Sequence, residues 1–127
     1  MPFTRITLGE HYSDEQAAAI SEILHQSLTD EFAVPLKDKF QVFERLPAVP
    51  RIFDANYQSG SRSKNFILFQ IIAGKARTDE QKQNFYRVLS EGLHRDLSID
   101  PDDVMVIIQF NHASDWSFSN GQMYCPM

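Results

Sequence analysis

Residues 77–108 read RTDEQKQNFYRVLSEGLHRDLSIDPDDVMVII, and this stretch resembles an earlier part of the same chain. The tetrapeptide T-D-E-Q at 78–81 matches S-D-E-Q at 13–16, 65 residues before it. At the same offset several other positions correspond: Leu24 and Leu89, Leu28 and Leu93, Phe32 and Leu97, Val34 and Ile99, Asp38 and Asp103, Val42 and Ile107. The sequence therefore predicts one structural unit that occurs twice.

Each copy of the unit contains the signal for the start of a helix. Ser13 and Thr78 are preferred N-cap residues, and each is followed three positions later by a glutamine that completes a capping box. Apolar residues then recur every three or four positions, as at Ala17, Ile20, Leu24, Leu28 and Phe32. This pattern predicts amphipathic helices over 14–31 and 79–96.

Apolar stretches flank both predicted helices and are predicted to be strands, at 3–8, 40–45, 65–73 and 104–110. A strand, a helix and a strand in series form a parallel pair with a right-handed crossover. The predicted fold class is therefore α/β (α+β): a tandem β-α-β repeat forming a four-stranded mixed sheet with two helices on one face. If the two units lie antiparallel, the first strand begins beside the end of the third.

The chain of 127 residues has the length of a single domain, 1–127. We expect β-α-β units at about 2–46 and 65–111, an exposed loop or hairpin at 47–64, and a C-terminal segment at 112–127. Two helices cover only one face of the sheet. We therefore expect a homo-oligomer that buries the other face, to which we assign Phe66, Leu68, Ile72, Val106 and Ile108.

Composition disfavours several classes of function. The net charge of −5 argues against nucleic-acid binding, and no apolar run approaches the ~18 residues of a membrane span. The start lacks a signal-peptide profile, and the single cysteine, Cys125, fits a reducing cytoplasm. The four histidines lack zinc spacing, so neither metal nor cofactor is expected. His25 is predicted to be exposed or interfacial. Arg62 could be an additional anion contact, but we favour a solvated loop charge.

Pro2 is the first residue whose position suggests chemistry. Initiator methionine is normally removed before a small residue, so Pro2 would become the N-terminus and carry a free secondary amine. An α-amine titrates near ~7.7–8.0, close to working pH, as a general acid or base requires. Proline at position 2 is also a common processing signal, so its position alone does not assign catalysis.

Lys75 and Arg77 follow the third predicted strand and come directly before the helix cap Thr78. Two cations beside a helix N-terminus form an anion site, and a carboxylate held there would bring a neighbouring carbonyl toward Pro2. The alternative is that both are solvated loop charges. Asp38 lies between Lys37 and Lys39, so it could be a plain surface residue. Its equivalence with Asp103 also fits a structural turn residue before a strand.

The chain resembles the tautomerase superfamily, and within it the malonate semialdehyde decarboxylase branch. The stretches that carry the resemblance are F-A-V-P-L-K-D-K-F-Q at 32–41, R-T-D-E-Q-K and F-Y within 77–86, D-P-D-D-V at 100–104 and D-W-S-F at 115–118. The resemblance implies a homotrimer in which each N-terminal proline lies in an active site.

The resemblance also implies roles for individual residues. Pro2 would be the catalytic proline, Asp38 the carboxylate that assists it, and Arg77 a catalytic cation. Lys75 and Arg77 would bind the substrate carboxylate, with Trp116 and Phe118 as aromatic walls. Lys75 departs from the family pattern, which has an arginine there, and lysine lacks the planar fork that orients a carboxylate.

The state of Pro2 decides between two reactions. A nearby carboxylate raises the pKa of an amine and favours a cationic Pro2 that polarises a carbonyl, as decarboxylation of a short 3-oxo acid or hydration of an acetylenic or acrylic acid requires. Desolvation lowers the pKa and favours a neutral base, as in a keto-enol tautomerase acting on a 2-oxo acid. A non-catalytic trimeric binding module is the third possibility.

Overall fold

The computed structural model describes residues 1–47 and 51–126. Strands β1 (Pro2–Gly9), β2 (Gln41–Leu46), β3 (Ile67–Ala73) and β4 (Val104–Phe110) alternate with helices α1 (Asp14–Phe32) and α2 (Asp79–Leu97). Two short 3₁₀ helices, η1 (Pro101–Asp103) and η2 (Ala113–Asp115), flank β4 and were not anticipated. All six predicted helices and strands are present, and their ends lie within two residues of the expected positions.

The ends of the two helices repeat each other closely. Both N-termini have the predicted capping box, on Ser13 and Thr78. Both C-termini are closed by a residue in the left-handed conformation, Ala33 with φ 54° and Ser98 with φ 56°. The residue after each cap donates its N–H six positions back, as in Val34 to the carbonyl of Leu28. The duplication read from the sequence is therefore a duplication of structure.

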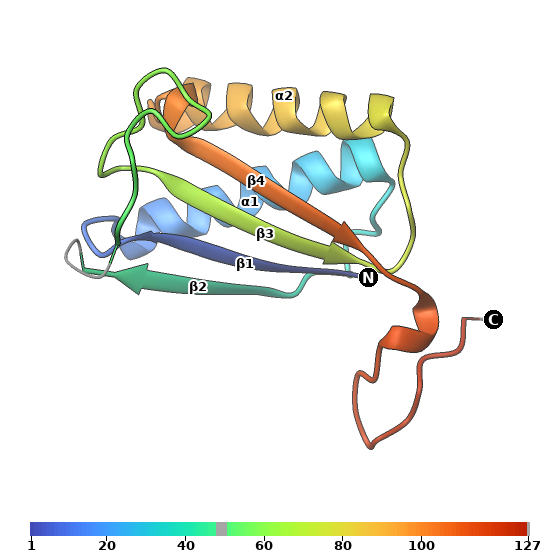
Figure 1. The fold of residues 1–127 in the computed structure, drawn as a ribbon. Helices are drawn as coiled ribbons and strands as arrows, with labels where there is room; N and C mark the ends of the chain where they lie inside the picture. The colour runs from blue at the N-terminus through green and yellow to red at the C-terminus, as the bar shows by residue number, and fades with distance from the viewer. Residues whose placement is uncertain (48–50, 127) are drawn as a thin grey trace.

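The four strands form one mixed sheet in the order β2-β1-β3-β4, as Figure 1 shows. β1 pairs with β2 in parallel, β3 pairs with β4 in parallel, and the two units meet through the antiparallel pair β1 and β3. In that pair Pro2 lies opposite Ala73. The expected meeting of the first strand's start with the third strand's end is confirmed.

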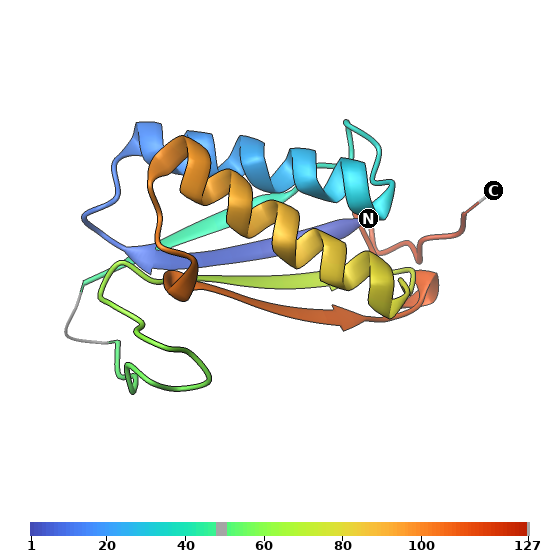
Figure 2. The ribbon, with the colours of Figure 1, turned by 90° about the horizontal axis from the view of Figure 1, so that it is seen from above.

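Both helices cover the same face of the sheet, and the hydrophobic core lies between the two layers (Figure 2). Alternate residues of β1 and β3 point into this core, because successive side chains of a strand point to opposite faces. Phe32 of α1 stacks on Phe85 of α2 with ring centroids 4.8 Å apart. Within the described part of the chain, the core contains 15 buried residues, among them Ile6, Leu8, Leu24, Leu28, Phe69, Leu89 and Leu93.

Among the described residues, no helix or strand covers the opposite face of the sheet (Figure 1). Two residues were assigned to this face wrongly: Val106 and Ile108 pack against the core, because they lie in register with Phe69 and Ile71 on the helix side. Their neighbour Ile107 points outward instead and is 41% exposed. Phe66 precedes β3 and packs edge-on against Phe53. The outward apolar side chains of the strands include Phe3, Val42, Leu46, Leu68, Ile72, Met105 and Ile107.

Two segments lie outside the α/β layers. The described part of the 47–64 connection contains turns but no strand, so a hairpin is absent from residues 51–64. Arg62 in this loop is 8% exposed and donates to the carbonyl of Tyr57, so its prediction as a solvated charge was wrong. The C-terminal segment after β4 projects beyond the sheet (Figure 1). Among the described residues, no helix is long and apolar enough to cross a membrane.

Candidate active site

The amino terminus lies against Asp38. The amino nitrogen of Met1 is 2.9 Å from Oδ2 of Asp38, and this ion pair joins positions 37 residues apart. Pro2 is buried behind Met1 as the first residue of β1. Pro2 and Asp38 line one cavity of about 270 Å³, whose other lining residues are Met1, Lys39, Phe40, Phe118 and Tyr124. The structure thus brings together the proline and the carboxylate selected from the sequence.

A turn between α1 and β2 carries Asp38 to this position. After the left-handed cap at Ala33, the N–H of Asp38 closes a turn on the carbonyl of Pro35. The side chain of Asp38 remains 44% exposed. Its repeat equivalent Asp103 differs, because it is 3% exposed and accepts hydrogen bonds from the N–H and hydroxyl of Ser63. Asp103 is a structural turn residue, whereas the carboxylate of Asp38 contacts the amino terminus.

The register between β1 and β3 places Lys75 and Arg77 on the other side of Met1. Both line a second cavity of about 460 Å³, together with Met1, Phe32, Ala33, Pro35, Gly74, Ala76 and Gln81. Met1 is the residue that lines both cavities. Loss of Met1 would therefore remove the side chain that lies between the proline side and the cationic side.

Arg77 is held by the end of helix α1. Its guanidinium donates to the carbonyl of Phe32 at 2.8 Å and to the carbonyl of Lys75, and it lies over the Phe32 ring at 5.2 Å. Burial lowers the pKa of Arg77 from its usual value, yet an arginine remains charged at neutral pH. A guanidinium has five N–H donors, so these two bonds leave donors for a ligand. Lys75 is exposed at the rim.

The C-terminal segment supplies an aromatic wall. Trp116 stacks on Phe118 with centroids 5.4 Å apart, and Phe118 meets Tyr124 edge-on at 5.2 Å. The indole N–H of Trp116 donates to Oδ1 of Asn111 at 2.7 Å. Phe118 reaches the Pro2 cavity, whereas Trp116 lies behind it and close to Gly74. Tyr124 also lines the cavity and was missed in the sequence, where no motif marks it.

A cavity at the other end of the sheet is the repeat equivalent of the cavity that Lys75 and Arg77 line, but its side chains differ in charge. Its lining residues His11, Tyr12, Gln16, Leu97, Ser98 and Asp100 are the repeat equivalents of Ala76, Arg77, Gln81, Phe32, Ala33 and Pro35. Tyr12 stands at the equivalent of Arg77, and Glu10 at the equivalent of Lys75. The duplicated cavity thus lacks both cations. Within residues 1–47 and 51–126, no group of three His, Cys, Asp or Glu side chains could hold a metal ion.

Comparison with known proteins identifies the family. A family model described as "Tautomerase enzyme" matches residues 38–119. Two relatives from Bacillus subtilis (strain 168) carry the names "Probable tautomerase YusQ" and "Probable tautomerase YrdN". They are 32% and 30% identical over 122 residues, which make up 96% of this chain and 96% and 94% of theirs. The chain belongs to the tautomerase family.

Solved structures agree with the fold and with the resemblance noted in the sequence. A malonate semialdehyde decarboxylase aligns with a TM-score of 0.87 and 30% identity over 95% of this chain and 93% of its own. FG41 malonate semialdehyde decarboxylase aligns with a TM-score of 0.86 and 28% identity over 95% and 92%. A fused 4-OT solved as a symmetric trimer shares the fold at 16% identity, with a TM-score of 0.77 over 95% and 94%. The predicted likeness to the tautomerase superfamily is confirmed.

Proposed function

We propose that this protein is a cofactor-independent lyase that uses the amine of Pro2 to decarboxylate a short 3-oxo acid such as malonate semialdehyde. The observation that carries the proposal is the carboxylate of Asp38 at the amino terminus, in the cavity that Pro2 lines. A carboxylate beside an amine favours the ammonium form and raises the pKa of that amine. A cationic Pro2 is the form that polarises a carbonyl.

The reaction follows from this charge state. The ammonium of Pro2 donates a hydrogen bond to the carbonyl oxygen at C3 of the substrate. The bond between C2 and the carboxylate carbon then breaks, CO₂ leaves, and the electron pair forms an enolate whose oxygen the ammonium stabilises. Protonation at C2 completes the product. Alternatively the neutral amine adds to the carbonyl and loses water to form an iminium, and the same bond cleavage gives an enamine that is protonated and hydrolysed.

Lys75 and Arg77 are proposed to hold the substrate carboxylate. They lie beyond Met1, which separates their cavity from that of Pro2 and Asp38. Binding alone would stabilise the ground state as much as the transition state, so the cations assist only by holding the carboxylate out of the plane of the carbonyl. Phe118 and Trp116 are proposed to exclude water from the reacting end of the site. The same arrangement allows hydration of acetylenic or acrylic acids.

A keto-enol tautomerase acting on a small 2-oxo acid is the second candidate, because both Bacillus relatives are named as tautomerases. That reaction needs Pro2 as a neutral base, so the pKa of Pro2 discriminates between the candidates. We further propose a homotrimer in the cytoplasm, in which neighbouring subunits bury the outward face of the sheet. The exposure of Val42 and Ile107 on that face supports this assembly.

One experiment tests the proposal directly. Wild type and Pro2→Ala are compared on a panel of small 2-oxo and 3-oxo acids, with CO₂ and aldehyde release as the signal for decarboxylation. Mass spectrometry first establishes that the protein begins at Pro2, and NMR titration gives the pKa of its amine. A pKa above ~8 with CO₂ release supports the lyase, whereas a pKa below ~7.7 with enol turnover supports the tautomerase. A retained Met1 would support the non-catalytic module.

A further inference from the structure

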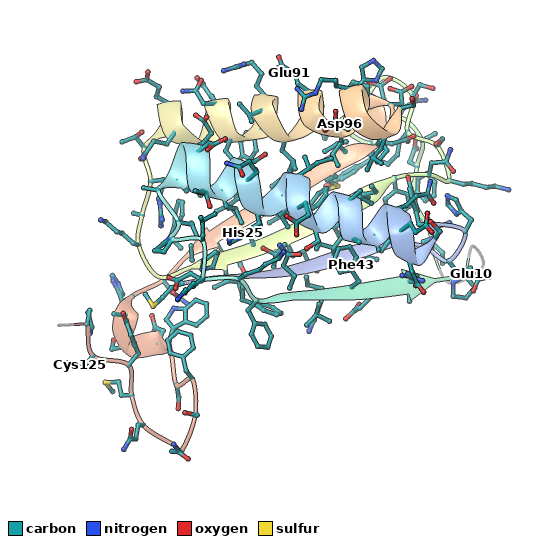
Figure 3. The ribbon with its side chains drawn as sticks, turned by 180° about the vertical axis from the view of Figure 1, so that it is seen from behind. Glu10, His25, Phe43, Glu91, Asp96 and Cys125 are labelled. Atoms are coloured by element: carbon teal, nitrogen blue, oxygen red, sulfur yellow. The ribbon has the colours of Figure 1, made fainter. Side chains whose placement is uncertain are left out.

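The segment that carries Asp38 is attached to helix α1 by a buried histidine. His25 is 6% exposed, so the expectation that it lies at the surface was wrong. Its Nε2 is 2.8 Å from the backbone carbonyl of Leu36, two residues before Asp38. Because a carbonyl only accepts, Nε2 carries the proton and donates. Figure 3 shows His25 on α1, beside the segment that leads into β2.

After Asp38 the same segment is held to β1 by the N–H of Thr4, which donates to the carbonyl of Phe40, and to α1 by side-chain contacts. Lys39 forms an ion pair of 2.9 Å with Glu22, and the hydroxyl of Ser21 donates to Oε1 of Gln41 at 2.6 Å. The Lys39–Glu22 pair is exposed, with Glu22 78% accessible, and such pairs contribute little to stability. Before Asp38, by contrast, the His25 ring is buried, and breaking its partly buried hydrogen bond would leave a buried donor without a partner.

We propose that His25 is a positioning residue for the Pro2 site, holding the turn at 35–38 against α1 so that the carboxylate of Asp38 stays at the amino terminus. The turn itself is weakly held, because Leu36 is 69% exposed and the N–H of Asp38 bonds only within the turn. His25 therefore links the rigid helix to a carboxylate that would otherwise be carried by an exposed loop. This inference rests on the proposed role of Asp38 beside the Pro2 amine.

The link matters because the influence of Asp38 on the amine depends on distance. A displacement of about 1 Å at a catalytic group can cost roughly 100-fold in rate. Arg77 is held by the carbonyls of Phe32 and Lys75. No hydrogen bond among the described residues joins either cation to the 35–38 turn, which contributes only Pro35 to the wall of their cavity. Loss of the His25 bond should therefore alter the charge state of Pro2 and leave carboxylate binding unchanged.

The test compares three variants of the full-length, processed protein. His25→Ala deletes the donor, His25→Gln keeps an N–H donor on a side chain of similar reach, and Glu22→Gln removes the exposed ion pair from the same helix as a matched control. For each variant we would measure kcat, KM, the melting temperature and the pKa of Pro2 by NMR titration. The titration reads the amine directly and needs no turnover.

We expect His25→Ala to lower kcat roughly 10- to 100-fold and to shift the pKa of Pro2 downward, while KM stays within about twofold. His25→Gln should restore most of both quantities, and Glu22→Gln should match wild type. In an Asp38→Asn background, His25→Ala should have no further effect on the pKa of Pro2. A lower melting temperature with an unchanged pKa of Pro2 would overturn the positioning role and leave the proposed reaction standing. If no oxo acid is turned over but the pKa shift is seen, the reaction fails and the positioning role stands.

Discussion

Pro2 lies directly opposite Ala73 in the antiparallel register of β1 and β3. This pairing joins the two copies of the repeat, and it brings the residues after Ala73 next to the amino terminus. Gly74, Lys75 and Arg77 therefore lie beside Met1, although more than 70 residues of chain separate them. A register slip of one residue would turn the side chains of β3 to the opposite face of the sheet and move the residues after Ala73 away from Met1.

Replacing Pro2 tests the centre of the site. We expect Pro2→Ala to lower kcat at least about 100-fold, because a primary amine differs from the secondary amine in basicity and position. Some iminium-type turnover can persist, since alanine also has a free amine after Met1 is removed. Steady-state kinetics on the best substrate, with circular dichroism to verify folding, provide the measurement. Unchanged turnover would show that the site has been assigned to the wrong residue.

The two cations should differ in their effects. Arg77→Ala should cost roughly 10- to 150-fold in kcat/KM on a carboxylate substrate, the equivalent of one charge-assisted hydrogen bond. It should also lower the free energy of unfolding by about 1–2 kcal/mol, because the Phe32 carbonyl loses its donor. Lys75→Ala should reduce kcat/KM less and leave stability unchanged.

Two further substitutions complete this comparison. Lys75→Arg restores the family's pair of arginines and should increase decarboxylation of malonate semialdehyde if the lysine limits that reaction. Arg87→Ala, which removes an exposed guanidinium from α2, is the control and should behave as wild type. Wild-type turnover of carboxylate substrates by Arg77→Ala would place the anion site elsewhere.

Gly74 leaves space for the indole of Trp116. A Cβ at this position would lie 2.9 Å from Nε1 and 3.4 Å from Cδ1 of Trp116, which is too close for the ring to remain in place. We expect Gly74→Ala to displace Trp116, break its bond to Asn111 and reduce activity. Trp116 is the only tryptophan, so intrinsic fluorescence reports its displacement. Gly60→Ala is the control, since its Cβ would meet its nearest neighbour at an ordinary 3.4 Å and its emission should not change.

The proposed trimer depends on the outward face of the sheet. Ile107→Lys places a charge on that face and should convert a trimer into smaller species, because burying an unpaired charge between subunits is unfavourable. Tyr86→Lys on α2 is the matched control, with a starting exposure of 38% against 41% for Ile107. Light scattering at micromolar protein concentration distinguishes a trimer from smaller species. A wild-type monomer, or a trimer that tolerates Ile107→Lys, would contradict the proposed interface.

Ionisation of Tyr12 should make the free energy of unfolding depend on pH in the alkaline range. Burial, and then the charge of Asp103, raise the pKa of its hydroxyl, which donates to the carbonyl of Asn65. A raised folded-state pKa stabilises the protein below the unfolded pKa near 10, and that stabilisation is lost as pH rises through the folded pKa. Urea denaturation should show Tyr12→Phe about 1 kcal/mol less stable than wild type at about pH 8, with a smaller difference at about pH 11. A difference that grows with pH would contradict this assignment.

The sequence alone determined the elements and their duplication. The capping boxes at Ser13 and Thr78, and the apolar periodicity after them, act within one or two helical turns, so the signal lies in adjacent residues. Pro2, Asp38, Lys75 and Arg77 could be selected because they stand next to these elements and match a family pattern. The predicted strand ends indicated where along the chain each of these four residues lies relative to the sheet.

Only the tertiary structure decided which faces and which distant residues meet. The orientation of Val106 and Ile108 was unreadable because β4 is apolar on both sides, so only its register with β3 fixes which side chains face the helices. The burial of His25 and the arrival of Tyr124 at the Pro2 cavity likewise depend on segments that meet after folding. Such contacts join residues far apart in the chain, and their geometry is set by packing and strand register, which no short stretch of sequence encodes.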